Sequence, residues 1–229
     1  MNIRELFDDM WALYVRINPS VNEVRKLMEQ HEGGPVKNDH IAIRTFNHPR
    51  VNREVLAKSF LDSGYKPVED LKFEKKKLDA TYYLHDDDDL TRVFISELKL
   101  EEFSPELQET INQLINQIPN KAIEQFDFCN SGTPWNPITK ETYDFLKEES
   151  EYAAWVATFG FIVNHFTISV TDCNSFENLE QVNSFLKENG YRINDSGGEI
   201  KGSVEQGLEQ SSILAEDIIV EFDSLEYEP

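Results

Sequence analysis

The sequence has few cysteines, few basic residues and no long apolar run. Its two cysteines, Cys129 and Cys173, form no CxxC motif and are too few for a disulfide framework, which favours a reducing compartment. Lysine and arginine together number 22, against 43 aspartates and glutamates, so the formal net charge is -21. A charge of this sign repels phosphate backbones and anionic membrane surfaces, so the composition predicts no binding to nucleic acid or membranes.

The N-terminal stretch MNIRELFDDMWALYVRI carries acidic and basic residues within its apolar pattern. A signal peptide or a membrane span needs an uninterrupted apolar segment, so this stretch is predicted to be neither. We therefore expect a cytoplasmic protein. A chain of 229 residues is long for a minimal domain and short for two independent ones, so one α+β domain built from two sub-units is expected.

Four segments of the chain differ in their hydrophobic periodicity. Helical spacing of apolar residues predicts a helical lead over 1–37 and a helical insertion over 99–160, in which one helix runs from Thr139 to about Thr158. Period-two alternation and turn residues predict a β-α-β-β-β module over 38–98. The same order begins again in residues 161–229, which are expected to form a second module without its last strand.

The two modules share a histidine at the entrance of their first strand. His40 lies in NDHIAIRTF and His165 lies in VNHFTISV, and each is followed by a helix that a glycine ends, Gly64 after 24 residues and Gly190 after 25. Histidine and helix end are thus nearly in phase, which indicates a duplication. A further strand of the second module is expected in SSILAEDIIVEF, residues 211–222.

Two such modules, packed together, would bring His40 and His165 to face each other across one cavity. Two imidazoles and one carboxylate can hold Fe(II) while leaving positions open for substrate and O2, and zinc with a water suits the same ligands. The alternative is two hydrogen-bonded residues at strand edges. Arg44 lies four residues after His40 and so projects to the same strand face. Its guanidinium can bind a carboxylate substrate in a bidentate fork, and the alternative is a surface salt bridge.

Four stretches together resemble the 2-oxoadipate dioxygenase/decarboxylase family: DHIAIRTF, RVFISEL, FGFIVNHFTIS and GGEIKGSVEQGLEQSSILAED. The fold of this family is similar to the vicinal oxygen chelate superfamily, so the resemblance implies paired βαβββ modules in a partly open, barrel-like sheet. It also implies an Fe(II)-dependent enzyme that converts 2-oxoadipate and O2 into 2-hydroxyglutarate and CO2 in lysine breakdown. The resemblance places metal ligands on His40 and His165 and a catalytic arginine on Arg44, all three in the substrate site.

The resemblance leaves the third metal ligand unassigned. In the superfamily a carboxylate on the last strand of the second module completes the site, and the chain ends at Glu226-Tyr227-Glu228-Pro229, before that strand is expected. Glu97, on the closing strand of the first module, is the first candidate to replace it, and the alternative is a surface or supporting acid. Glu216 and Glu221 alternate with apolar residues, which predicts solvent-facing side chains.

Two other functions remain open from the sequence. A zinc- or nickel-dependent lyase, isomerase or hydrolase would keep the fold and change the metal. A metal-free module would bind an acidic metabolite without turning it over. Fold alone does not distinguish these functions, because function depends on the site. The sequence does not indicate an oligomeric state.

Overall fold

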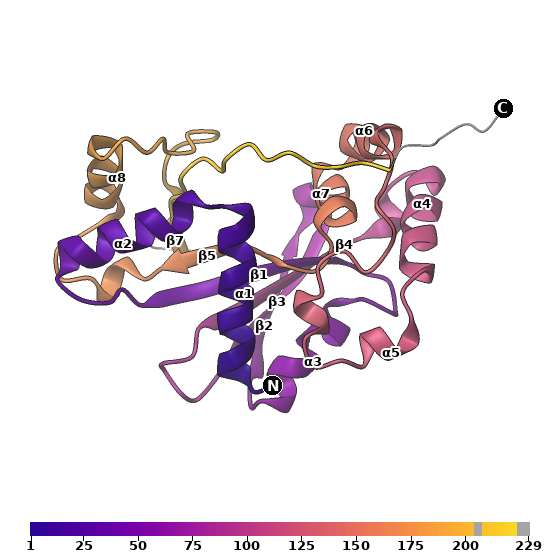
Figure 1. Cartoon of the computed structure of the whole chain (residues 1–229), viewed down its shortest axis with the longest axis horizontal. Helices are drawn as coiled ribbons and strands as arrows, with labels where there is room; N and C mark the ends of the chain where they lie inside the picture. Colours follow the sequence, from indigo (N-terminus) through magenta and orange to yellow (C-terminus); the bar gives the residue numbers. More distant parts are fainter. Residues whose placement is uncertain (204–207, 224–229) are drawn as a thin grey trace. The chain divides into compact units, whose positions relative to one another are not determined.

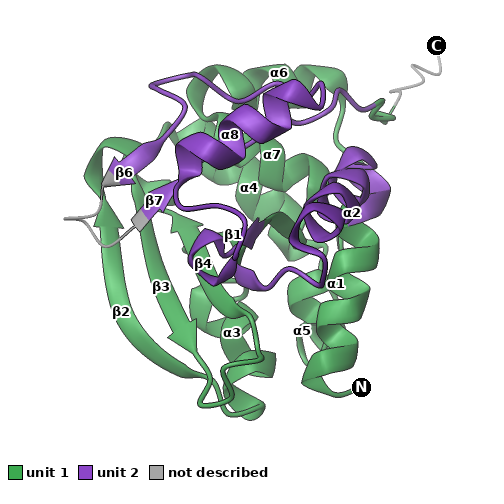
Figure 2. Ribbon diagram, turned by 90° about the vertical axis from the view of Figure 1, so that its left-hand side faces the viewer, with its two compact units in different colours: residues 1–14, 40–166, 219–229 green, residues 15–39, 167–218 purple. Residues whose placement is uncertain are grey.

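The computed structural model describes residues 1–203 and 208–223, which form two compact units (Figure 2). Unit 1 consists of Met1–Tyr14, His40–Phe166 and Ile219–Pro229, and unit 2 consists of Val15–Asp39 and Thr167–Ile218. Unit 1 therefore contains residues 40–98 of the segment expected as the first module, together with the whole segment 99–160 expected as a helical insertion.

A mixed five-stranded sheet has the strand order β2-β3-β4-β1-β5 (Figure 1). β1 runs parallel to β4, whereas β2, β3 and β4 are antiparallel neighbours. The described residues also form eight α-helices, so the α+β class predicted from the sequence is confirmed, with a sheet that is not closed. The strands are β1 (Asn38–Phe46), β2 (Lys66–Phe73), β3 (Leu78–Leu84), β4 (Arg92–Leu98) and β5 (Val163–Ile168).

The two faces of strand β1 differ: one carries apolar side chains of the core, and the other carries polar side chains of the candidate site. Ile41 and Ile43 are fully buried and belong to one cluster with Leu56 and Phe60 of α3 (Arg53–Asp62). Helix α1 (Ile3–Ile17) adds apolar side chains to the same cluster. Because side chains alternate along a strand, His40, Ala42 and Arg44 point to the opposite face of the sheet. The elements of residues 38–98 follow the expected order, β1-α3-β2-β3-β4.

The segment from Thr139 to Thr158 forms two helices and not the single one predicted. Ser150 has φ -156° and ψ 106°, an extended conformation that ends α6 (Lys140–Glu149) and precedes α7 (Glu151–Phe159). Its Oγ accepts a hydrogen bond of 3.1 Å from the backbone N–H of Ala153, so the serine caps α7. Apolar periodicity continues across the break, which is why the prediction missed it. Two further helices of this unit are α4 (Pro105–Asn116) and α5 (Asn120–Ile123).

A tight glycine turn leads from α7 to β5. Gly160 has φ +68°, and a Cβ atom at this position would overlap the backbone of Gly132 and Thr133. Gly132 and Phe161 exchange two backbone hydrogen bonds of 3.1 and 2.8 Å, which hold the two segments this close. The turn therefore fixes where β5, with His165, enters the sheet.

Unit 2 contains α2 (Ser20–Glu32), α8 (Leu179–Glu188) and a small hairpin of β6 (Lys201–Ser203) and β7 (Leu208–Gln210). The strand predicted over 211–222 is wrong: in the described residues its only sheet-like pairing is an isolated bridge between Ile213 and Ile193. The apolar residues of this segment do not share a buried face, since Leu214 is 39% and Ile219 97% exposed. None of the described helices is long and apolar enough to cross a membrane.

Candidate active site

The structure places His40 and His165 side by side in unit 1. They come from β1 and β5, which are neighbours in the sheet, and their Nε2 atoms are 3.3 Å apart. The two rings are nearly perpendicular, with centroids 5.3 Å apart and an interplanar angle of 84°. The juxtaposition expected from the sequence repeat is therefore present.

The spacing of the two nitrogens fits one metal ion. Two imidazole nitrogens that lie about 2.1 Å from the same ion, at an angle near 90–110°, are about 3.0–3.4 Å apart. Burial, with smaller contributions from the charges of His40 and Arg44, lowers the pKa of His165 to about 3. The ring is therefore neutral at pH 7, as a metal ligand has to be. Without a metal, a long N–H···N hydrogen bond fits the same spacing.

Glu97 does not lie on the face of the histidine pair. The register between β1 and β4 pairs Glu97 with Thr45 and Ser96 with Arg44, so Glu97 projects to the side opposite Arg44. There its carboxylate accepts a 2.9 Å hydrogen bond from the backbone N–H of Arg53, and burial raises its pKa. The expectation that Glu97 replaces the third ligand is corrected: it supports the start of α3.

The described residues do not supply another third ligand. No group of three or more histidine, cysteine, aspartate or glutamate side chains that could hold a metal occurs within residues 1–203 and 208–223. Glu216 and Glu221 are exposed, as predicted from their alternation. The segment Glu226-Tyr227-Glu228-Pro229 lies outside the described residues.

Arg44 lies against two aromatic rings of α7. Its guanidinium carbon lies 5.1 Å from the ring centroid of Tyr152 and 5.0 Å from that of Trp155. Burial lowers the pKa of the guanidinium, and Arg44 forms no ion pair with a carboxylate in the described part of the chain. A partly buried cation without a counter-ion is costly, so the arrangement suits an incoming anion better than a surface salt bridge.

Tyr152 fastens α7 to two strands of the sheet, a role that the sequence did not reveal. Its hydroxyl donates a 2.7 Å hydrogen bond to the Ser96 carbonyl and accepts a 3.1 Å hydrogen bond from the Thr45 backbone N–H. Burial raises the pKa of this hydroxyl. Tyr152 and Trp155 are apolar positions of a helix in the sequence pattern, and only the fold shows that they surround Arg44.

Replacing Tyr152 by phenylalanine is expected to lower the free energy of unfolding by about 1–3 kcal/mol, because the Thr45 N–H and the Ser96 carbonyl lose a buried partner. The ring that faces Arg44 is retained. Urea unfolding followed by circular dichroism measures the change. Tyr143→Phe is the matched control, since no hydrogen bond of its hydroxyl occurs in the described residues. A loss below 0.5 kcal/mol in Tyr152→Phe, within the range of ordinary surface substitutions, would contradict this role.

Asn164 connects the histidine pair to the arginine. Two neighbours assign the orientation of its amide, because the Ala42 carbonyl can only accept a hydrogen bond and the Arg44 guanidinium can only donate one. In this orientation the amide nitrogen donates to His165 Nδ1 over 3.2 Å and to the Ala42 carbonyl over 3.3 Å. Its amide oxygen then accepts from Arg44 Nη2 over 3.2 Å. Asparagine before the second histidine is visible in the sequence, but nothing in the sequence pattern assigns it a role.

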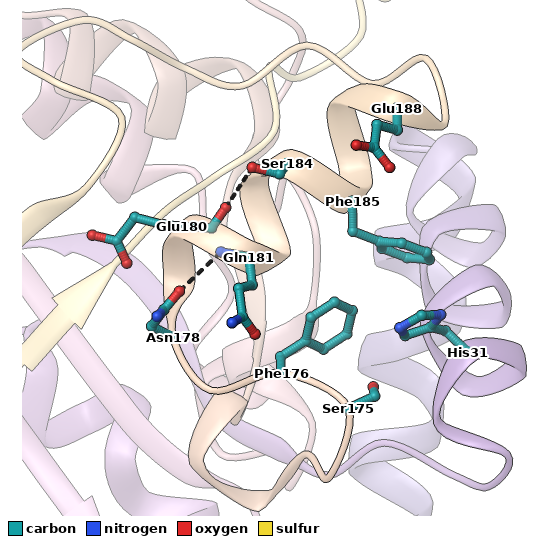
Figure 3. Close-up of a pocket in the computed structure, with 9 residues that line it drawn as sticks. All are labelled: His31, Ser175, Phe176, Asn178, Glu180, Gln181, Ser184, Phe185 and Glu188. Atoms are coloured by element: carbon teal, nitrogen blue, oxygen red, sulfur yellow. Dashed lines mark hydrogen bonds between the residues drawn. The ribbon is translucent and has the colours of Figure 1, made fainter.

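A separate groove lies in unit 2, lined in part by His31, Phe176 and Phe185 (Figure 3). The His31 ring lies against both phenylalanines, with centroid distances of 4.9 and 4.4 Å. His31 therefore packs within unit 2, and none of the groove's lining residues belongs to the predicted site.

Comparison with known proteins shows the family of this chain. The family model of 2-oxoadipate dioxygenase/decarboxylase matches residues 6–228. A chloroplastic 2-oxoadipate dioxygenase/decarboxylase of Arabidopsis thaliana is 34% identical over 232 residues, which cover 96% of this chain and 62% of the relative. The chain thus spans less than two thirds of the length of this relative.

Solved structures with the same fold share between 47% and 18% of their residues with this chain. A Shewanella frigidimarina protein, described as a candidate hydrolase, is 47% identical with a TM-score of 0.91, over 96% of this chain and 86% of that one. A hydroxyglutarate synthase from Oryza sativa, crystallised with 2-oxoadipate, is 31% identical with a TM-score of 0.84, over 93% and 72%. A Ralstonia eutropha protein assigned to the glyoxalase superfamily shares the fold alone, at 18% identity and a TM-score of 0.73, over 88% and 69%. This chain belongs to the 2-oxoadipate dioxygenase/decarboxylase family.

Proposed function

We propose that the protein is a non-haem Fe(II)-dependent dioxygenase and decarboxylase that acts on a 2-oxo diacid in the cytoplasm, as a step of lysine degradation. In the proposed reaction, 2-oxoadipate and O2 give 2-hydroxyglutarate and CO2, so that both atoms of O2 enter the products. The family membership supports this reaction, as does the relative crystallised with 2-oxoadipate. The observation that carries it is Arg44, a cation without a carboxylate partner in the described residues, joined through Asn164 to a histidine pair with metal-ligand spacing.

The proposal includes a fold of the vicinal oxygen chelate type with two βαβββ modules. The order β1-α3-β2-β3-β4 supports the first module, and the order β5-α8-β6-β7 supports a second module with one strand fewer in the described residues. The likeness to the glyoxalase superfamily protein is consistent with this fold. Duplicated modules would explain why one histidine comes from β1 and its partner from β5.

Each residue of the site has a separate task in the proposed reaction. His40 and His165 would hold Fe(II) through their Nε2 atoms, and bound Fe(II) would supply the redox chemistry that activates O2. Arg44 would bind a carboxylate of the diacid and orient it. Tyr152 and Trp155 keep the guanidinium in place and limit its contact with water. The Tyr152 hydroxyl is already committed to the backbone, so it is not a proton donor to substrate.

The proposed function is tested by reconstituting the protein anaerobically with Fe(II) and then measuring O2 consumption with a panel of 2-oxo diacids. We expect uptake that depends on both Fe(II) and 2-oxoadipate, with one CO2 and one 2-hydroxyglutarate formed per O2. Parallel samples with Zn(II) or Ni(II) address the lyase, isomerase and hydrolase alternatives. Absence of substrate-dependent O2 uptake, or turnover of the substrate with Zn(II) alone, would contradict the oxygenase proposal.

Replacing Arg44 by methionine is expected to lower kcat/KM for the diacid about 100-fold or more, mainly through a higher KM. Removing one partner of a buried, hydrogen-bonded charge pair costs about 2–5 kcal/mol, and methionine keeps most of the apolar contact with the two rings. Steady-state O2 uptake over a range of substrate concentrations measures the effect.

Arg44→Lys keeps the charge but loses the planar fork, so its kcat/KM should fall between those of the wild type and Arg44→Met. Arg16→Met is the matched control, because Arg16 is exposed on α1 and its loss should leave KM unchanged. An Arg44→Met variant with the wild-type KM would show that the diacid binds elsewhere.

A further inference from the structure

The amide of Asn164 satisfies three groups in one orientation. Its nitrogen donates to His165 Nδ1 and to the Ala42 carbonyl, and its oxygen accepts from Arg44 Nη2. The three distances, 3.2, 3.3 and 3.2 Å, lie at the long end of the range for such bonds. One side chain thus contacts both the proposed metal ligand and the proposed substrate-binding residue.

This orientation, which the Ala42 carbonyl and Arg44 select independently of the histidine, determines the tautomer of His165. A neutral imidazole carries one N–H, and Nδ1 accepts a hydrogen from Asn164, so the proton resides on Nε2. Nε2 is the nitrogen that faces His40 over 3.3 Å. A protonated nitrogen has no lone pair for a metal, so this tautomer is not the one that binds it.

Metal binding through Nε2 therefore requires the proton to move to Nδ1, which then needs a hydrogen-bond acceptor. Asn164 can provide one only by turning its amide by half a turn, so that its oxygen faces Nδ1. The same turn directs the amide nitrogen toward Arg44 Nη2, so two donors face each other and Arg44 loses its acceptor. It also brings the amide oxygen toward the Ala42 carbonyl, which disfavours the turned state in the absence of ligands.

We propose that Asn164 couples the two halves of the site, so that a metal ion on His165 and a carboxylate on Arg44 each favour binding of the other. This inference rests on the proposed function to the extent that His165 takes a metal. A metal on His165 would favour the turned amide of Asn164, in which Arg44 is free to bind an external carboxylate. Conversely, a carboxylate bound to Arg44 would lower the free energy of the turned amide, because Arg44 then no longer needs the amide oxygen as its acceptor. Asn164 is in this sense a positioning residue, and by linkage the two effects are equal in size.

This coupling is tested by measuring Zn(II) affinity in competition with a chromophoric chelator, with and without saturating glutarate. Glutarate is a diacid that lacks the 2-oxo group. In the wild type, we expect glutarate to raise Zn(II) affinity about 10-fold, within the usual range of coupling between sites. Asn164→Leu should lose most of this increase, and what it retains is direct contact between glutarate and the ion. Full retention in Asn164→Leu would overturn the inference.

Asn164→Asp separates coupling from simple damage to the fold. A carboxylate can only accept, so it should hold Nδ1–H and strengthen Zn(II) binding, while its ion pair with Arg44 weakens glutarate binding. Weakening of both ligands would overturn the inference, since only a structural defect acts on them alike.

In 15N-histidine spectra, with His165→Gln for assignment, the proton should move from Nε2 to Nδ1 on Zn(II) binding. A wild type that binds no Zn(II) would overturn the proposed metal site as well, whereas failure of the Asn164 variants alone leaves that site standing.

Discussion

Alanine at His165 is expected to weaken Fe(II) binding by more than about 100-fold and to abolish substrate-dependent O2 uptake. The loss of a residue that only supports a ligand already costs 10–100-fold in metal affinity, and His165 would supply one of the two nitrogens that the described residues offer. Metal content after anaerobic dialysis, and O2 uptake with 2-oxoadipate, measure the two effects. The fold should persist, because the buried cluster of unit 1 does not include this ring.

His40→Ala should give the same result, and the double variant should be little worse than either, because residues that act as one unit do not contribute additively. His31→Ala is the control: this histidine packs against Phe176 and Phe185 within unit 2, so metal content should not change. If the His165→Ala protein retained wild-type iron, the metal would have to be bound elsewhere.

Alanine at Gly160 is expected to cost more than about 4 kcal/mol of folding free energy or to prevent recovery of folded protein. The backbone has φ +68° and ψ -144°, which a residue with a Cβ rarely adopts, and the added atom would overlap the backbone of Gly132 and Thr133. Backbone cannot rotate away as a side chain can, so the two hydrogen bonds between Gly132 and Phe161 would break. Urea unfolding, or the soluble yield if the loss is complete, measures this.

Gly190→Ala provides the comparison, because Gly190 also has a positive φ, +89°, but an added Cβ there would meet nothing within 4 Å. Its cost should be limited to backbone strain, about 1–2 kcal/mol. The difference between the two variants isolates the close approach of Gly160 to Gly132. Equal stabilities would show that this approach contributes nothing.

The histidine pair and Arg44 could be located from the sequence because two simple rules place them. The repeat expected from the sequence put His40 and His165 at equivalent strand entrances, and alternation along a strand puts Arg44 on the face of His40. The structure has both juxtapositions. The roles of the histidines as metal ligands and of Arg44 in binding the substrate carboxylate stay predictions.

Glu97 shows what such rules leave out. The repeat identified the strand that carries it but not the register of that strand, and a shift of one residue moves a side chain to the other face. Pairing of Glu97 with Thr45, and not with Arg44, places it beside Arg53 and the start of α3. Register depends on contacts between distant segments, which one sequence does not display.

The predicted strand over 211–222 failed for a related reason. Alternating apolar residues indicate a half-buried strand only if a partner strand and a core are present on one side. Leu214, Ile218 and Ile219 are exposed, so the alternation here does not reflect burial. Asn164 and Tyr152 were missed because hydrogen bonds to residues far along the chain leave no periodic signal.

The division of labour along β1 has an evolutionary consequence. Ile41 and Ile43 bury their side chains in the core, whereas His40 and Arg44 on the other face carry the proposed chemistry. Substitutions of His40 or Arg44 would remove the proposed activity without destabilising the folded structure. Descendants of this fold could therefore lose the proposed catalysis without losing structure, and positions 41 and 43 should stay apolar after His40 and Arg44 have changed.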